Sequence, residues 1–360
     1  MFNNSFKNRK ILVTGDTGFK GSWLSIWLKS LGAEVYGYAL PPKTERDNFV
    51  LCGLDKIIHH QDGDIRDLGT LTKFFGDVRP DYAFHLAAQP LVIDSFNDPH
   101  YTFETNIMGA VNFFEAVRKT DSVRSAVNVT SDKCYKNNEW VWGYRESDPM
   151  GGKDPYSASK SGSEIVSLSY IESFFSKAGT PSVATARAGN VIGGGDWAEN
   201  RIVPDFFRAL DKKQELELRN PDSTRPWQHV LEPLSGYLSL AGMLFEQGKK
   251  FSGGWNFGPN SELNISVREL IEEMISSIGE GQFKSPQSKQ KFHEAGLLNL
   301  DISKAMHDLN WSPALSFDET VRMVVEGYSD EKGDDIYSKR IKQIDEYVSI
   351  AESKNIQWSL

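Results

Sequence analysis

The first half of the chain alternates short apolar, β-branched runs with longer segments whose apolar residues recur at helical spacing. The short runs predict strands, and the amphipathic segments between them predict helices. The expected strands are Lys10–Thr14, Glu34–Tyr38, Tyr82–Leu86, Ser125–Thr130 and Ser182–Arg187. The expected helices are Lys20–Leu31, Leu68–Phe75, Thr102–Lys119 and Ser157–Lys177. This alternation predicts an α/β fold with a doubly wound parallel sheet, covered by helices on both faces.

The alternation breaks after about residue 188. A glycine-rich loop at Gly193–Gly195 is followed by shorter elements, among them an expected strand Leu216–Arg219 and an expected helix Val267–Ser277. No repeat or Ser/Gly linker separates the two parts, so we expect them to share one cleft. The expected division is a sheet domain at 1–188 with a returning segment near 226–258, and a smaller, mixed α/β C-terminal substrate lobe at 189–225 and 259–360.

Composition narrows the class of protein. The 360 residues are 39% hydrophobic and 25% charged, and no apolar run is long enough to span a bilayer. The polar start, Met1–Lys10, carries no secretory signal, so we expect a cytoplasmic protein. Two cysteines, Cys52 and Cys134, are too few for a disulfide framework or a four-cysteine zinc site, and we expect no metal. The net charge of −9 argues against a nucleic-acid partner.

A glycine-rich loop, Gly15-Asp16-Thr17-Gly18-Phe19-Lys20-Gly21, directly follows the first expected strand and opens the first expected helix. Its glycines allow a tight turn and let backbone N–H groups approach a pyrophosphate at the positive end of the helix. This context predicts a Rossmann-type dinucleotide site. The residues expected to contact the cofactor here are Gly15, Thr17, Gly18, Phe19, Lys20 and Gly21.

A second pattern, Tyr156-x-x-x-Lys160, lies at the start of a long expected helix, so the two side chains are one turn apart. A neighbouring ammonium and the positive nicotinamide ring favour the tyrosine phenolate, which can remove a hydroxyl proton while hydride leaves carbon. Ser131, just after a strand, supplies a hydroxyl for Tyr156 and for a substrate oxygen. Together with the glycine loop, these residues predict a hydride-transfer enzyme.

The G-x-x-G-x-x-G spacing and the set Ser131, Tyr156 and Lys160 resemble the extended short-chain dehydrogenase/reductase family. The resemblance implies NAD as the cofactor. It also implies that Asp64 and Ile65 contact the adenine, and that further cofactor contacts come from Leu86, Ala87, Ala88, Gln89, Asn106, Tyr156 and Lys160. For Asn106 a plain helix-to-loop hydrogen bond is the alternative.

One feature of an NAD site is missing from the sequence. The second strand runs into Tyr38-Ala39-Leu40-Pro41-Pro42-Lys43, with no carboxylate for the adenosine ribose hydroxyls. Lys43 or Arg46 would favour a 2′-phosphate, or they are simply solvated loop charges. NADP therefore stays open beside NAD.

The residues that follow Ser131 are the most specific. Ser131-Asp132-Lys133 resembles the strand end of nucleotide-sugar 4,6-dehydratases, with a lysine where members acting on dTDP-glucose carry glutamate. That departure resembles the branch that acts on CDP-glucose, and the likeness extends from about Lys10 to Tyr328. It implies that Tyr156 takes the C4 hydroxyl proton, that Asp132 protonates the departing C6 hydroxyl, and that hydride returns to C6. Lys133 is then the candidate base at C5, or it only anchors the loop and holds Asp132.

The two phosphates of a nucleotide sugar must be neutralised locally in a chain of charge −9. Arginine suits this task because its planar fork meets two phosphate oxygens at once. Asn190 resembles the family residue that touches the diphosphate. The candidate substrate-binding residues are therefore Arg187, Asn190, Arg201, Arg219 and Arg225.

The resemblance also implies a homodimer or homotetramer formed through the long helices at 102–119 and 157–177, and a place in deoxysugar and O-antigen biosynthesis. Two other classes remain possible. One is an epimerase, reductase or dehydratase acting on a dTDP-, GDP- or UDP-linked sugar, and the other is a non-catalytic nicotinamide sensor. An epimerase needs no acid/base pair at C6, so Asp132-Lys133 weighs against it, and a sensor need not keep Ser131, Tyr156 and Lys160.

Overall fold

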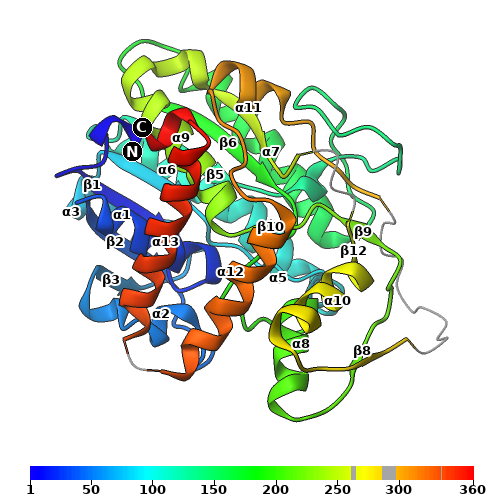
Figure 1. Cartoon of the computed structure of the whole chain (residues 1–360). Helices are drawn as coiled ribbons and strands as arrows, with labels where there is room; N and C mark the ends of the chain where they lie inside the picture. The colour runs from blue at the N-terminus through cyan, green and yellow to red at the C-terminus, as the bar shows by residue number, and fades with distance from the viewer. Residues whose placement is uncertain (261–264, 286–296, 334) are drawn as a thin grey trace.

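The computed structural model describes residues 1–260, 265–285, 297–333 and 335–360. Its centre is a seven-stranded sheet in the order β11-β6-β5-β4-β1-β2-β3, with every neighbouring pair parallel (Figure 1). The strands are β1 (Lys10–Thr14), β2 (Glu34–Ala39), β3 (His59–Asp62), β4 (Tyr82–His85), β5 (Ser125–Val129), β6 (Ser182–Ala188) and β11 (Gly253–Phe257). The chain order reverses between β1 and β4, which is where such sheets bind ligands.

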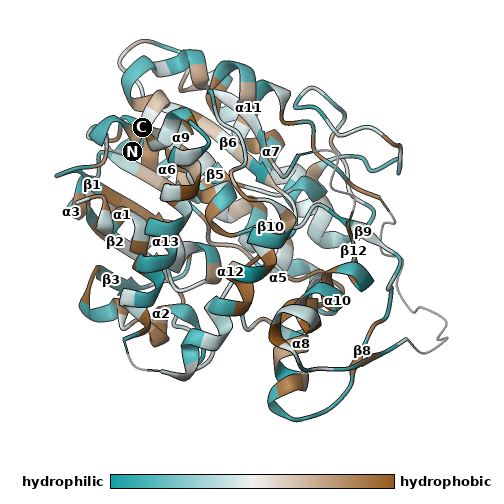
Figure 2. Cartoon of the chain, viewed as in Figure 1, coloured by the Kyte–Doolittle hydropathy of each residue, from teal (hydrophilic) through white to brown (hydrophobic). Residues whose placement is uncertain are grey.

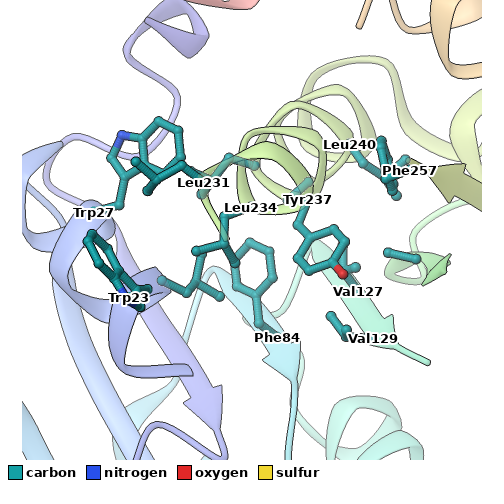
Figure 3. Close-up of a cluster of buried hydrophobic side chains, with 14 of the residues drawn as sticks. Trp23, Trp27, Phe84, Val127, Val129, Leu231, Leu234, Tyr237, Leu240 and Phe257 are labelled. Carbon is teal, nitrogen blue, oxygen red and sulfur yellow. The ribbon is translucent and has the colours of Figure 1, made fainter. Parts of the chain in front are cut away.

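Helices cover both faces of this sheet, as expected for the doubly wound class. On one face lie α1 (Phe19–Ser30), α9 (Leu231–Gln247) and α13 (Ile336–Ser353), and on the other α3 (Leu68–Val78), α6 (Gly109–Lys119) and α7 (Pro155–Ser173). Within β1, Ile11 and Val13 belong to the first core and Leu12 to the second. Figure 3 shows the first core, where Trp23 and Trp27 of α1 face Leu231 and Leu234 of α9.

The smaller lobe has a core of its own around Phe206, Leu270 and Val324. Its helices are α8 (Ile202–Asp211), α10 (Val267–Ile278) and α12 (Phe317–Ser329), and Figure 2 shows hydrophobic and hydrophilic residues side by side along them, as in amphipathic helices. Short strand pairs accompany them: β7 (Val191–Ile192) with β10 (Gln228–His229), β8 (Leu216–Glu217) with β13 (Phe283–Lys284), and β9 (Thr224–Arg225) with β12 (Ile265–Ser266). The remaining α-helices are α2 (Asn48–Leu51), α4 (Val92–Asn97), α5 (Pro99–Phe103) and α11 (Ser303–Asp308). Among the described residues, no helix combines the length and apolar character needed to cross a bilayer.

All five expected strands are present, but two strands of the sheet were missed. β3 has the sequence HHQD and is largely exposed, and β11 begins with two glycines, so neither shows an apolar run. The expected helix Thr102–Lys119 is interrupted. It consists of the end of α5, a π-helical turn at Glu104–Met108, and α6.

Helix α13 lies against α1, on the sheet domain, although the expected division placed it in the substrate lobe (Figure 1). Tyr347 of α13 packs edge-on against Trp27, and Arg340 is fully buried. Arg340 donates to Asn48 Oδ1 at 2.9 Å and to Glu331 Oε1 at 2.9 Å. Because aromatic packing on Trp27 and the hydrogen bond to Asn48 both hold α13 to the sheet domain, we propose that 336–353 belongs there.

Glu331 links this buried ion pair to the glycine-rich loop after β7. Its carboxylate accepts from Gly195 N at 2.6 Å and from Trp197 Nε1 at 2.8 Å. Gly195 has a φ of +82°, and a side chain there would collide with Asn48. The C-terminal helix therefore fixes the loop that begins the substrate lobe.

We predict that Arg340→Met lowers the free energy of unfolding by about 3 kcal/mol or more, because it leaves the Glu331 carboxylate buried without its cation. Urea denaturation followed by tryptophan fluorescence measures the change. Arg322→Met on α12 is the matched control, since that arginine is 42% exposed in its ion pairs with Glu326 and Glu346. Its removal costs about 1 kcal/mol or less. If both variants lost the same free energy of unfolding, the buried Arg340–Glu331 pair would be no more important to stability than the exposed pairs of Arg322.

Candidate active site

The glycine loop packs closely against the residues that follow β4. Gly15 has a φ of +78°, and a Cβ there would lie 2.5 Å from Ala87 N. A Cβ at Gly21 would lie 2.0 Å from Gly15 O. No side chain caps the α1 N-terminus at Gly18. The loop thus forms a close-packed backbone cradle beside the first turn of α1, and this geometry fits the pyrophosphate of a dinucleotide.

Other expected cofactor residues surround this cradle. Thr17 donates its hydroxyl to Leu40 O at 2.9 Å, which ties the loop to the end of β2. Ile65 is buried and packs under Gly109 of α6. The Asp64 carboxylate is held by the Arg66 guanidinium at 2.7 Å, which lowers the pKa of Asp64. A direct contact of Asp64 with adenine stays a prediction.

A carboxylate that the sequence analysis missed lies beside the end of β2. Asp62 of β3 is in register with Ala39, and its side chain is 66% exposed. Its Oδ1 lies 3.1 Å from His60 Nε2, and His60 Nδ1 in turn lies 2.7 Å from Asp16 Oδ2. The sequence analysis missed Asp62 because a ribose-binding carboxylate is expected at the end of β2, whereas Asp62 lies on the neighbouring strand β3.

Asn106 and Gln89 form a buried clamp. The Asn106 amide accepts from Gln89 N at 2.8 Å and donates to Gln89 O at 3.0 Å and to Ser159 Oγ at 2.8 Å. The Gln89 amide donates to Thr102 Oγ1 at 2.8 Å. The helix-to-loop bond considered for Asn106 is therefore present. Asn106 thus holds the loop Leu86–Gln89, which contains Ala88, against α7, and Gln89 ties it to α5. A contact of this loop or of Asn106 with the cofactor stays a prediction.

Ser131, Asp132 and Lys133 lie at the carboxyl end of β5, where the chain turns into a 3-10 helix at Asp132–Cys134. Ser131 Oγ donates to Asp132 Oδ1 at 2.9 Å and accepts from Lys133 N at 3.3 Å. Asp132 is only 2% exposed, and Lys133 Nζ lies 3.8 Å from its Oδ1. Asp132 Oδ2 is buried with no hydrogen-bond partner in the described part of the chain, and a Cβ at Gly189 would lie 3.3 Å from it. This oxygen is thus available to a ligand.

Tyr156 and Lys160 lie in the first turns of α7. Pro155 opens the helix and the Asp154 side chain accepts from Ser157 N at 2.9 Å, so the helix start is fixed. Tyr156 is 8% exposed, and the Ser131 hydroxyl lies close enough to act on its pKa. Burial raises the pKa of Tyr156 to about 12, and the Ser131 hydroxyl only partly opposes it. The charge of Arg201 also lowers the pKa of Tyr156, as expected of a nearby cation, but desolvation outweighs it.

Two further groups approach this cluster from α1 and α9. Lys20 Nζ lies 3.5 Å from Tyr237 Oη, and Figure 3 shows Tyr237 reaching toward Val127 and Val129 of β5. Desolvation lowers the pKa of Lys20 to about 7, and the charge of Lys160 adds to this shift. Burial likewise lowers the pKa of Lys160 to about 8. Tyr237 was missed because it lies within a helix that is apolar all round.

Arg187 does not fit the expected substrate-binding role. It is 4% exposed, and its guanidinium pairs with Glu164 at 2.8 Å and bonds Tyr135 Oη at 2.5 Å. Glu164 of α7 also accepts from the hydroxyls of Thr130 and Thr185. Arg187 therefore joins β6 to α7 inside the protein.

The other expected diphosphate contacts lie nearer the lobe. Arg201 precedes α8, is 35% exposed at its side chain and pairs with Asp196 at 2.9 Å. Its charge acts on both Lys20 and Tyr156. Asn190 accepts from Gln228 N through its backbone at 3.1 Å. Arg219 is exposed after β8, and Arg225 lies in β9. In the described part of the chain, no group of His, Cys, Asp and Glu is arranged to hold a metal.

Comparisons with known proteins agree with this geometry. The family model for GDP-mannose 4,6 dehydratase matches residues 12–324. A CDP-glucose 4,6-dehydratase of Salmonella typhimurium is 44% identical over 96% of this chain and 98% of its own length. A CDP-paratose 2-epimerase of Salmonella typhi is 26% identical over 87% of this chain and 97% of its own length.

Among solved structures, a dTDP-glucose 4,6-dehydratase of Streptomyces venezuelae with NAD bound superposes with a TM-score of 0.77 at 25% identity. The match covers 90% of this chain and 98% of that one. The chain therefore belongs to the GDP-mannose 4,6-dehydratase family, within the extended short-chain dehydrogenase/reductase group.

Proposed function

We propose that this protein is an NAD-dependent hydro-lyase that converts CDP-glucose into CDP-4-keto-6-deoxyglucose and water. The observation that carries the proposal is the Asp132-Lys133 pair beside Ser131 and Tyr156, with a buried carboxylate oxygen of Asp132 open to a ligand. The 44% identity to a CDP-glucose 4,6-dehydratase selects this nucleotide. Such a product is a precursor for deoxysugars such as those of O-antigens.

The residues divide between an oxidation at C4 and an elimination across C5 and C6. NAD supplies the hydride acceptor at C4 and the hydride donor at C6. Tyr156 removes the C4 hydroxyl proton, and Lys160, one turn on, is placed to stabilise the negative charge that develops on the tyrosine oxygen as its own proton leaves. The Ser131 hydroxyl, which acts on the pKa of Tyr156, is placed to bond the sugar oxygen.

The C4 ketone acidifies the hydrogen on C5. Lys133 removes that proton as a neutral amine, and Asp132 gives a proton to the departing C6 oxygen from the side that faces Gly189. The alternative role of Lys133, holding Asp132 in place, is supported by their separation of 3.8 Å. Hydrogen exchange at C5 in a Lys133→Ala variant distinguishes a base at C5 from a residue that only holds Asp132.

The cofactor is held by the backbone cradle of Gly15, Gly18 and Gly21, where a Cβ at Gly15 or Gly21 would collide with the backbone. We propose that Asp62 replaces the missing carboxylate of β2 at the adenosine ribose. Arg46 is engaged elsewhere, paired with Asp211 at 3.0 Å and stacked on Trp197. A 2′-phosphate would have to displace these contacts, which favours NAD over NADP.

For the substrate diphosphate we retain Asn190, Arg201, Arg219 and Arg225. Arg201 is the strongest of these, because its charge already reaches the Tyr156 cluster and part of it is exposed. Its ion pair with Asp196 orients the guanidinium near the start of α8. We place the protein in the cytoplasm, where its two buried free thiols, Cys52 and Cys134, stay reduced.

We also propose a homodimer through α5, the π-helical turn and α7. Large apolar side chains are exposed there: Phe103 at 37%, Met108 at 49%, Ile165 at 60% and Leu168 at 57%. These exposed apolar residues lie on elements that contact one another, and a gathering of such residues on a polar surface marks an interface. Two copies meeting through these helices would bury it.

The substrate assignment is tested with purified protein, NAD and a panel of CDP-glucose, dTDP-glucose, UDP-glucose and GDP-mannose. We expect a product lighter by one water from CDP-glucose, and at least a hundredfold lower kcat/KM with the others, because a polar base site rejects a mismatched base strongly. Mass spectrometry of the nucleotide sugar gives the result. Absence of a dehydrated product from CDP-glucose would overturn the proposal.

Lys133→Ala tests the base at C5. We expect the rate of C5 hydrogen exchange with D2O to fall by about a hundredfold or more, because general bases contribute about that much. Oxidation at C4 should persist, seen as slow formation of reduced cofactor. The control is Lys136→Ala, an exposed lysine three residues away. Exchange at the wild-type rate in Lys133→Ala would assign Lys133 to holding Asp132 instead.

The dimer is tested by the double variant Ile165→Glu with Leu168→Glu. Light scattering coupled to size exclusion should report twice the chain mass for wild type and a single chain mass for the variant, because buried unpaired carboxylates oppose association. Met306→Glu, an exposed apolar residue of α11, is the control and should stay dimeric. A wild-type monomer at micromolar concentration would refute the interface.

A further inference from the structure

Three oxygen-bearing groups lie close together at the end of β5. Ser131 Oγ donates to Asp132 Oδ1 at 2.9 Å, and the same hydroxyl lies close enough to Tyr156 to lower its pKa. All three are buried, with exposed fractions of 8%, 7% and 2%. A hydroxyl can accept one proton while it gives up another, so Ser131 is able to conduct a proton between its neighbours.

Proton accounting in the proposed reaction makes this arrangement significant. Each turnover adds one proton to the residue that accepts from the C4 hydroxyl and removes one from the residue that protonates the C6 hydroxyl. The C5 proton returns to C5, so it cancels. If Tyr156 and Asp132 worked separately, one proton would have to leave Tyr156 and another reach Asp132 through solvent in every cycle, although both side chains are buried.

We propose that Ser131 is a proton relay between Tyr156 and Asp132. For each proton that Tyr156 takes from the C4 hydroxyl, Asp132 receives one, and it gives this proton to the C6 oxygen, which leaves as water. The inference rests on the proposed dehydratase function and adds a role for Ser131 beyond binding the sugar oxygen. In this proposal the base of the oxidation, Tyr156, and the acid of the elimination, Asp132, are the two ends of one path of proton transfer.

The steps balance as follows. As C4 loses its hydride to NAD, the C4 hydroxyl proton passes to Tyr156 Oη, the Tyr156 proton to Ser131 Oγ, and the Ser131 proton to Asp132 Oδ1. Lys133 then takes the C5 proton, the C6–O bond breaks, and Asp132 gives its proton to the leaving oxygen. Hydride returns to C6 and Lys133 returns its proton to C5. Tyr156 ends as a phenol and Asp132 as a carboxylate, which is how they began.

The resting protonation states agree with this order. Burial keeps Tyr156 a neutral phenol, and the Ser131 hydroxyl points its hydrogen at the Asp132 carboxylate. The Ser131 end of the relay is therefore already oriented toward the aspartate. Protonation of Asp132 also removes the negative charge that lies 3.8 Å from Lys133 Nζ.

Asp132 has the freedom that the relay needs. Its Oδ1 faces Ser131, whereas Oδ2 has no partner among the described residues and lies toward Gly189. A half-turn about the Cβ–Cγ bond exchanges the two oxygens, and such torsions are broad and nearly twofold. The proton received on the serine side can then be presented to the substrate.

The test compares two leaving groups in Ser131→Ala. With CDP-glucose, elimination needs a proton on Asp132, whereas CDP-6-deoxy-6-fluoroglucose loses fluoride, a weak base that departs without one. We expect the ratio of elimination to C4 oxidation to fall at least tenfold with CDP-glucose and less than twofold with the fluoro sugar. Rapid-quench mass spectrometry measures water loss, and a fluoride electrode measures fluoride.

A second readout does not depend on water loss. In D2O, Ser131→Ala should still incorporate deuterium at C5 of the 4-keto sugar that keeps its C6 hydroxyl, because Lys133 is intact. Ser131→Thr keeps the hydroxyl and should restore the wild-type ratio. Asp132→Asn cannot carry a proton and should show the same leaving-group selectivity, and the double variant should be no worse than the poorer single variant. Circular dichroism checks that each variant is folded.

The outcomes separate the two proposals. If Ser131→Ala slows oxidation but elimination keeps pace with both sugars, Ser131 only positions the sugar oxygen and the relay is wrong. If wild-type protein yields no dehydrated product from CDP-glucose, the dehydratase function itself fails, whatever the variants do.

Discussion

The covering of the parallel sheet on both faces is the constraint on which the site depends. With α1, α9 and α13 on one face and α3, α6 and α7 on the other, neither face has room for a ligand. Only the carboxyl edge of the sheet remains open. The loops after β1, β4 and β5 all end at that edge, so Gly15, Ala87 and Ser131 come together although more than a hundred residues separate the first from the last.

Buried polar contacts then set the position of α7 against this edge. Glu164 joins the helix to Thr130 of the β5 end and to Arg187 of β6, while Asn106 joins Ser159 to the loop after β4. Each buried partner left alone would cost several kcal/mol, so the helix cannot slide without breaking several bonds at once. Tyr156 and Lys160 inherit this fixed position. Such rigidity matters because proton transfer requires donor and acceptor within hydrogen-bond reach.

The sequence was sufficient for elements whose signal is local. Strands β1, β2, β4, β5 and β6 have apolar runs, and the glycine loop and the Tyr-x-x-x-Lys pair have fixed spacing. Prediction from the sequence failed where an element depends on contacts between residues that are distant in the chain. β3 forms because β2 offers it a hydrogen-bonding edge, and the π-helical turn contains Asn106, whose bonds to Gln89 reach a loop distant in sequence. Arg187 resembled a phosphate ligand in sequence, but only the fold reveals Glu164 beside it.

The same distinction applies to the chemistry. From the sequence, Ser131, Asp132 and Lys133 are three adjacent residues with separate roles, and no pattern tells which atoms meet. In the structure the Ser131 hydroxyl bonds the aspartate and acts on the pKa of the tyrosine, and the other aspartate oxygen is left for a ligand. A neutral tyrosine with a pKa near 12 is a weak base on its own. It becomes an effective one when its own proton has somewhere to go, and the carboxylate that takes this proton is thereby made into the acid that the next step requires.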